Sequence, residues 1–223
     1  MAYSVDLEQR LKDAIGESSD TIFGALHSTT QLDIVTDALW IVARSLPHEL
    51  LLDKAGTATA YTVNNASATA ISDKVLLHVV KKSGDGLDYI AARKIPITES
   101  QKALDTNSIY KATNNSPVYW LDEGKLKLAP DTANVTHYDA KYYAYTKQIP
   151  SALGNSLTNF PQEAFSAVVY LAGANLINNA LHTFSEDESP EEYAGWKAHS
   201  ATLMEMFGVE MSVIKGKEGG EEA

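Results

Sequence analysis

The chain has 223 residues, a formal net charge of −11 and no cysteine, which excludes disulfides, thiolate nucleophiles and cysteine-ligated zinc. Hydrophobic residues make up 44% of the sequence, which is enough for a folded chain with a real core. The acidic balance argues against general nucleic-acid binding, because such surfaces need clustered Lys and Arg.

The beginning of the chain alternates charged with apolar residues and does not match a signal peptide. No apolar run approaches the roughly 18–20 residues of a membrane span. The lack of cysteine is typical of a protein made in a reducing cytoplasm. These features predict a cytoplasmic site of synthesis and no membrane partner.

Two amphipathic helices are predicted in the first 55 residues. Apolar residues recur at helical spacing in 6–15, and a stronger helical pattern spans 32–46 before Pro47 stops it. One apolar stripe along this second segment comprises Leu32, Val35, Leu39, Val42 and Leu46. Such a stripe is typical of core packing rather than of a ligand site.

Between residues 56 and 149 the pattern changes to that of β-strands. Short segments rich in β-branched and aromatic residues alternate with Gly, Asn, Asp and Pro, which favours an antiparallel sandwich or a small barrel. The strand-like segments are 57–65, 67–72, 74–82, 87–95, 116–121, 125–130 and 140–147.

The segment 115–130 predicts a β-hairpin. Asp122-Glu123-Gly124 forms its connection, and Gly124 is free to take a positive φ. In the second strand, lysines alternate with leucines, so one face of the strand is expected to be exposed to solvent and the other buried. The residues expected to build this structural hairpin are Pro117, Tyr119, Trp120 and Gly124. A further hairpin loop is predicted at 83–86.

Helices return after residue 150. Pro161 starts the segment 161–184, whose small residues permit close approach of another helix. Ser189 and Pro190 start a last helix, which is expected to continue through Phe207. The remaining segment, 208–223, is predicted to be an extended, flexible tail, because its apolar residues alternate with polar ones and are too few to bury themselves.

The fold class that follows is α+β: a helical bundle body with an inserted antiparallel β lobe, either a small barrel or a sandwich. The expected parts are 1–55 for the N-terminal helices, 56–149 for the β lobe, 150–207 for the C-terminal helices and 208–223 for the tail. The stripe of 32–46 is expected to pack against 161–184.

No catalytic, cofactor or metal motif is found. The six histidines form no zinc signature, and the sequence has neither a nucleophile elbow nor a P-loop. His182 and His199 leave room for an acid–base pair, and the acids of 186–192 for Ca²⁺, but strand, helix and helix-start roles explain these residues better. We therefore predict a protein that is not an enzyme and has no cofactor.

Aromatic residues suggest a partner surface instead. Tyr138, Tyr142, Tyr143 and Tyr145 lie in one strand-like segment, and exposed rings of this kind stack on single-stranded nucleic acid or sugar. Tyrosine is also an ordinary strand residue, and the basic residues that nucleic acid needs are sparse. Any of these rings that are exposed therefore favour a protein interface.

Several segments resemble structural proteins of tailed bacteriophages. In those proteins a segment of the form D-x-N-S-I-Y-x-A-T-x-x-S-P-V-Y precedes a hairpin. The matching stretches here are 93–96, LDTNSIYKAT at 104–113, SPVY at 116–119 and GKLKLAP at 124–130. Downstream, 160–172 resembles the helix that closes these proteins, so the resemblance covers roughly residues 20–206.

The resemblance implies a head-to-tail connector, or adaptor, in the neck of the virion. Such a protein is non-enzymatic and forms a homo-oligomeric ring, commonly of twelve copies, between the portal protein and the tail, nozzle or fibre proteins. DNA passes through the ring without sequence-specific binding. Another ring, such as a stopper or tail-tube protein, and an unrecognised hydrolase remain as alternatives.

The tail is the expected contact with the portal or a ring neighbour, because an extended segment orders on a sheet edge or in a groove. The candidate partner-binding residues are Val209, Met211, Val213, Ile214, Lys215 and Lys217. A frayed terminus without a role is the alternative reading of the same residues.

Overall fold

The computed structural model of the chain describes residues 6–16, 19–61, 69–83, 88–130, 140–154, 157, 159–184 and 189–216. The chain divides into two compact units. We call Met1–Lys54 together with Lys147–Ala223 the helical unit, and Ala55–Thr146 the β unit. The predicted fold class, a helical body with an inserted β lobe, is confirmed.

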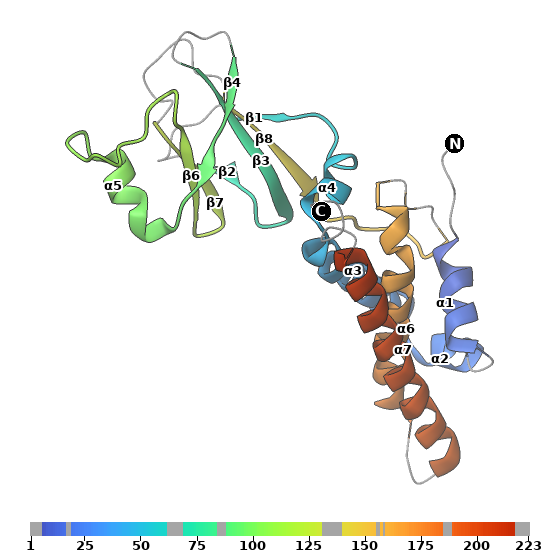
Figure 1. Cartoon of the computed structure of the whole chain (residues 1–223). Helices are drawn as coiled ribbons and strands as arrows, with labels where there is room; N and C mark the ends of the chain where they lie inside the picture. The colour runs from blue at the N-terminus through green and yellow to red at the C-terminus, as the bar shows by residue number, and fades with distance from the viewer. Residues whose placement is uncertain are drawn as a thin grey trace. The chain divides into compact units, whose positions relative to one another are not determined.

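The helical unit is built around one central helix, α6 (Phe165–Leu181), which packs against four other helices. Figure 1 shows α7 lying along α6 in this unit. The surrounding helices are α1 (Leu7–Ile15), α2 (Ser19–Ala25), α3 (Ser28–Ser45) and α7 (Pro190–Gly216), and the unit also contains α4 (His48–Leu52) and the 3₁₀ turn η4 (Gln162–Ala164). Because α6 has neighbours on several sides, buried residues surround most of its circumference.

Local signals set the helix ends. The carboxylate of Asp6 accepts a hydrogen bond of 3.1 Å from the backbone N–H of Gln9, and Gly16 ends α1 with a φ of 77°. Pro190 is the first residue of α7, where its missing N–H costs nothing. On α3, the stripe residues Val35 and Leu39 are buried, and the helix packs against α6 as expected.

The prediction of an extended, flexible tail from residue 208 is wrong as far as Gly216, because α7 continues to that residue. Met211 and Ile214 are only 7% and 4% exposed. With Leu203 and Phe207 they recur at spacings of four, four and three, which places them on one helix face. Burial of that face outweighs the cost of Gly208 inside the helix, about 1 kcal/mol.

The expectation that no apolar stretch has the length of a membrane span is also wrong. The segment Gln162–Leu181 is long and apolar enough to cross a membrane by length and composition. Its burial points to another role, since 72% of the apolar window lies inside the protein. The segment serves here as the core helix of the bundle.

The β unit consists of two four-stranded sheets, and no barrel closes among the described strands. One sheet has the order β1 (Thr59–Tyr61), β8 (Ala140–Thr146), β3 (Lys74–Lys82) and β4 (Tyr89–Ala91). The other has the order β2 (Thr69–Ala70), β7 (Lys125–Ala129), β6 (Val118–Asp122) and β5 (Arg93–Lys94). All pairs are antiparallel except β5 with β6, which is parallel.

Two clusters of buried side chains hold the β unit together. The first joins the two sheets into a sandwich, with Tyr61, Val79 and Tyr142 from one sheet against Leu126 and Leu128 from the other. The second lies around Val118 and Trp120 of β6 and includes Ala103 and Ala112. It is covered by the excursion between β5 and β6, which contains the 3₁₀ turn η3 (Ile97–Glu99) and α5 (Ser100–Leu104) (Figure 1).

Candidate protein-binding surfaces

The hairpin of β6 and β7 is a structural element, and its connection is shorter than predicted, because Asp122 is the last residue of β6. Asp122 pairs with Lys125, so Glu123 and Gly124 form a two-residue connection with φ values of 51° and 72°. Two positive φ values are typical of the type I′ turn that joins twisted strands. The expected positive φ at Gly124 is therefore confirmed.

The other hairpin residues face inward to different degrees. Pro117 and Trp120 are buried, and Tyr119 is half-buried, where burial raises the pKa of its hydroxyl. Trp120 belongs to the cluster under the excursion between β5 and β6. These side chains support the sandwich and leave little surface for a partner.

The six candidate partner-binding residues of the C-terminal segment do not form one surface. Val209 and Val213 are exposed on α7, with relative exposures of 62% and 50%. Met211 and Ile214 are buried, Lys215 is exposed, and Lys217 lies outside the described residues. The two valines therefore remain available to a partner, whereas Met211 and Ile214 belong to the helical core.

A groove in the helical unit leads toward these valines. It has a volume of about 610 Å³ and lies between α1, α6 and α7. Its lining residues are Arg10, Asp13, Ala14, Ser166, Val169, Tyr170, His199, Leu203 and Met206. We call it the helical groove.

An exposed apolar stripe continues from the helical groove along α7. Met206 lines the groove and is 42% exposed, and Val209 and Val213 follow at spacings of three and four residues. Residues at these spacings lie on one helix face. We call Met206, Val209 and Val213 the α7 stripe. Sequence reasoning identified the two valines but assigned them to an extended segment.

His199 helps to fix the groove, since its Nε2 lies 2.9 Å from the carbonyl oxygen of Ala14 on α1. His182 follows the end of α6 and is exposed, and His78 is exposed on β3. Among the described residues, no group of three or more potential metal-ligating side chains gathers in one place. The acids 186–188 lie outside the described residues.

The second surface is the excursion of the β unit between β5 and β6. Ile109 and Tyr110, which we call the tip, are 90% and 67% exposed. The tip is held by local bonds: the backbone N–H of Tyr110 donates to Oγ of Ser108 over 3.0 Å, and that of Ala112 donates to the carbonyl of Ala103 over 2.9 Å. Two large apolar side chains exposed next to each other on an ordered turn make the tip a candidate interaction site.

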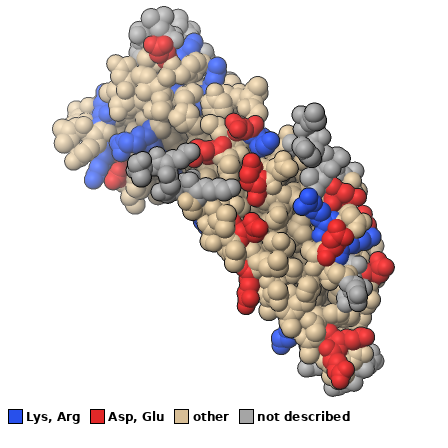
Figure 2. Space-filling model, turned by 45° about the vertical axis from the view of Figure 1, so that its right-hand side comes forward, with Lys and Arg blue, Asp and Glu red and all other residues tan. Residues whose placement is uncertain are grey.

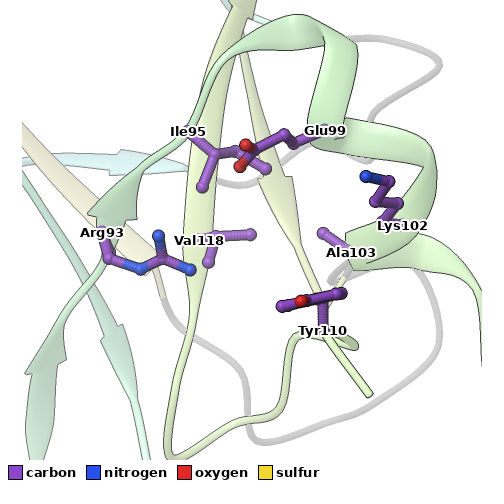
Figure 3. Close-up of a pocket in the computed structure, with 7 residues that line it drawn as sticks. All are labelled: Arg93, Ile95, Glu99, Lys102, Ala103, Tyr110 and Val118. Atoms are coloured by element: carbon purple, nitrogen blue, oxygen red, sulfur yellow. The ribbon is translucent and has the colours of Figure 1, made fainter. Parts of the chain in front are cut away.

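A hollow of about 390 Å³ lies beside the tip (Figure 3). Its apolar floor comprises Ile95, Ala103 and Val118, and its charged and aromatic rim comprises Arg93, Glu99, Lys102 and Tyr110. Within the described part of the chain, Arg93 forms no ion pair. Nζ of Lys102 lies 6.0 Å from the ring centroid of Tyr110, at the limit of a cation–π contact.

Sequence reasoning missed the tip and the hollow as a surface. The signal was the run Asp105 to Ser108, whose polar side chains bond their own backbone, as in the bond of 2.9 Å from the N–H of Asn107 to Oδ1 of Asp105. Such a run predicts turns, and large apolar residues that follow it within a turn are candidates for exposure.

Figure 2 shows basic side chains gathered on part of the β unit and acidic ones spread over the helical unit.

Comparison with protein-family models and with the sequences of curated proteins finds no match for this chain.

Proposed function

We propose that the chain is a non-enzymatic virion structural protein, a head-to-tail adaptor that forms a ring between the portal and the tail of a bacteriophage. The observation that carries this proposal is that each unit displays apolar side chains on ordered backbone: the tip in the β unit and the α7 stripe in the helical unit. Exposed apolar groups rimmed by charge are typical of surfaces that meet other proteins.

Two surfaces on one chain suit a ring subunit, which needs one contact for each neighbour and others for the proteins above and below it. The resemblance of 104–130 to phage structural proteins supports the same reading, because this stretch contains the tip and the hairpin. A tail-tube subunit, which would be mostly β, accords less well with a chain whose longest elements are α6 and α7.

The test combines the purified chain with portal rings of the same virus and measures co-sedimentation and negative-stain images. We expect a closed ring whose mass is a multiple of 24.2 kDa, seated on the portal. A ring that forms only on the portal is compatible with the proposal, because binding energy from a partner can drive assembly. A chain that stays monomeric and does not bind the portal would contradict it.

A further inference from the structure

We infer that copies of this chain associate head to tail, with the tip of one copy inserted into the helical groove of the next copy. This inference rests on the proposed function, because it names the contact through which ring neighbours meet. It commits to a second copy of the chain as the occupant of the groove.

The tip is an exposed projection, and the helical groove is a hollow that could receive it. The tip presents Ile109 and Tyr110 outward from an ordered turn, and the groove is a hollow of about 610 Å³ with Val169, Leu203 and Met206 in its wall. Apolar side chains that enter such a hollow leave water, which contributes about 25 cal/mol for each Å² of apolar surface removed. The α7 stripe extends the apolar surface beyond the groove.

The net charges of the two units also favour a contact between the β unit of one copy and the helical unit of the next. The helical unit carries 8 basic and 20 acidic residues, a formal charge of −12, whereas the β unit carries 10 basic and 9 acidic residues, a formal charge of +1. Two copies therefore repel when helical unit meets helical unit, and this repulsion is absent when a β unit meets a helical unit. Repulsion between like charges disfavours the wrong pairing and slows its encounter.

The charges next to the two surfaces are mixed, and their balance leans the same way. Lys102 and Lys111 are exposed in the excursion that carries the tip, with Arg93 on the rim of the hollow, and the acids Glu99 and Asp105 are exposed there too. Asp13 lines the groove, and Glu210 lies about one turn of α7 after Met206. Arg10 also lines the groove, where its guanidinium lies 5.8 Å from the ring centroid of Phe165.

A contact between two different surfaces is heterologous, and it closes into a ring when the rotation between neighbours permits. An isologous contact, in which the same surface meets itself, would stop at a dimer. The pairing of tip with groove is therefore the kind of contact that a ring subunit needs.

The absence of cysteine in the chain allows the contact to be trapped by a disulfide when oxidised glutathione is added to accept the two electrons that the thiols lose. One preparation carries Ile109→Cys and a second carries Met206→Cys, so that a cross-link between tip and groove joins two different chains. The matched control replaces Met206→Cys with Ile41→Cys, since Ile41 on α3 is 47% exposed and Met206 is 42% exposed. Melting curves check that each variant is folded.

We expect the tip–groove mixture to form disulfide-linked heterodimers at least about tenfold faster than the control mixture, because a specific contact raises the local concentration of the two thiols. Lys102→Glu combined with Lys111→Glu in the tip chain should slow trapping, and the corresponding Arg replacements should not. Added salt should also slow it. Equal rates in the two mixtures, or faster cross-linking of the tip variant with itself, would overturn the inference.

The trapping experiment contains no portal, so its result is separate from the test of the proposed function. Trapping with no binding to the portal would contradict the adaptor role and retain the head-to-tail contact. Portal binding without selective trapping would retain the adaptor role and reject this contact.

Discussion

Leu203 of α7 lies so close to Gly173 of α6 that a methyl group added at Gly173 would stand 3.2 Å from Cδ1 of Leu203. The same methyl group would lie 3.7 Å from Cγ1 of Ile15 on α1. Gly173 therefore sits where three helices meet, and its lack of a side chain permits their close approach. The sequence predicted such an approach from the small residues of 161–184.

Gly173→Leu should lower the free energy of unfolding by about 1–3 kcal/mol or more, because the added side chain overpacks the junction of α1, α6 and α7. The matched control is Gly208→Leu on α7, since a Cβ at Gly208 meets nothing within 4 Å. The control should raise stability by up to about 1 kcal/mol through helix propensity. Chemical denaturation measures both changes, and equal effects would mean that the helices do not meet at Gly173.

How far the sequence specified the fold depends on the length of each signal. The stripe through Val35, Leu39 and Val42 recurs over several turns, and the turn at Gly124 needs one residue type, so both were predictable. The short helix α5 has only five residues and is stabilised by contacts of the excursion, which no local pattern reveals. Of the residues in the two candidate surfaces, the sequence identified only Val209 and Val213. The others could not be identified, because the packing of the core decides which face of a helix or turn is exposed.

The β6–β7 turn gives a second prediction. Gly124→Val should lower the stability of the β unit by about 1 kcal/mol or more, since a β-branched residue is strained at a φ of 72°. Gly124→Asn is the control, because asparagine tolerates the left-handed region and should cost less. A melting curve compares them, and equal stability of the valine variant and the parent chain would contradict the turn geometry.

The packing of α3 against α6 gives a third prediction. Leu39→Ala should lower the free energy of unfolding by about 2–5 kcal/mol, because Leu39 is 1% exposed and its loss leaves a cavity. Ile41→Ala on the same helix is the control, since Ile41 is 47% exposed, and it should change stability by about 0.5 kcal/mol or less. A small effect at both positions would place the stripe outside the core.

Tyr145 gives a prediction that depends on pH. Its hydroxyl is buried without a hydrogen-bond partner among the described residues, and burial raises its pKa above the ordinary value of 10.0. The folded chain then keeps a proton that the unfolded chain loses, so this contribution to stability is present below about pH 10 and falls as the pH rises above it.

Tyr145→Phe should therefore weaken the alkaline loss of stability. At neutral pH it should leave stability unchanged or raise it by about 1 kcal/mol, because an unsatisfied buried hydroxyl is removed. Tyr145→Leu is the control for the ring itself and should destabilise the β unit at every pH. Denaturation curves at neutral pH and above pH 10 separate the two effects, and a phenylalanine variant less stable at neutral pH would indicate a bonded hydroxyl.

The end of α7 gives the last prediction, and it separates folding from binding. Met211 and Ile214 are buried, whereas Val209 and Val213 on the same two turns are exposed. Met211→Ala should therefore lower the free energy of unfolding by about 2 kcal/mol or more, and truncation after Gly208 should lower the melting temperature because it removes both buried residues. Val213→Ala is the control and should change stability by about 0.5 kcal/mol or less. A truncated chain that melts like the full chain would show that these turns of α7 contribute nothing to the core.

The binding role of the α7 stripe is tested by Val209→Asp combined with Val213→Asp. If the stripe meets a partner, this double variant should weaken ring formation or portal binding while its melting temperature stays close to that of the parent chain.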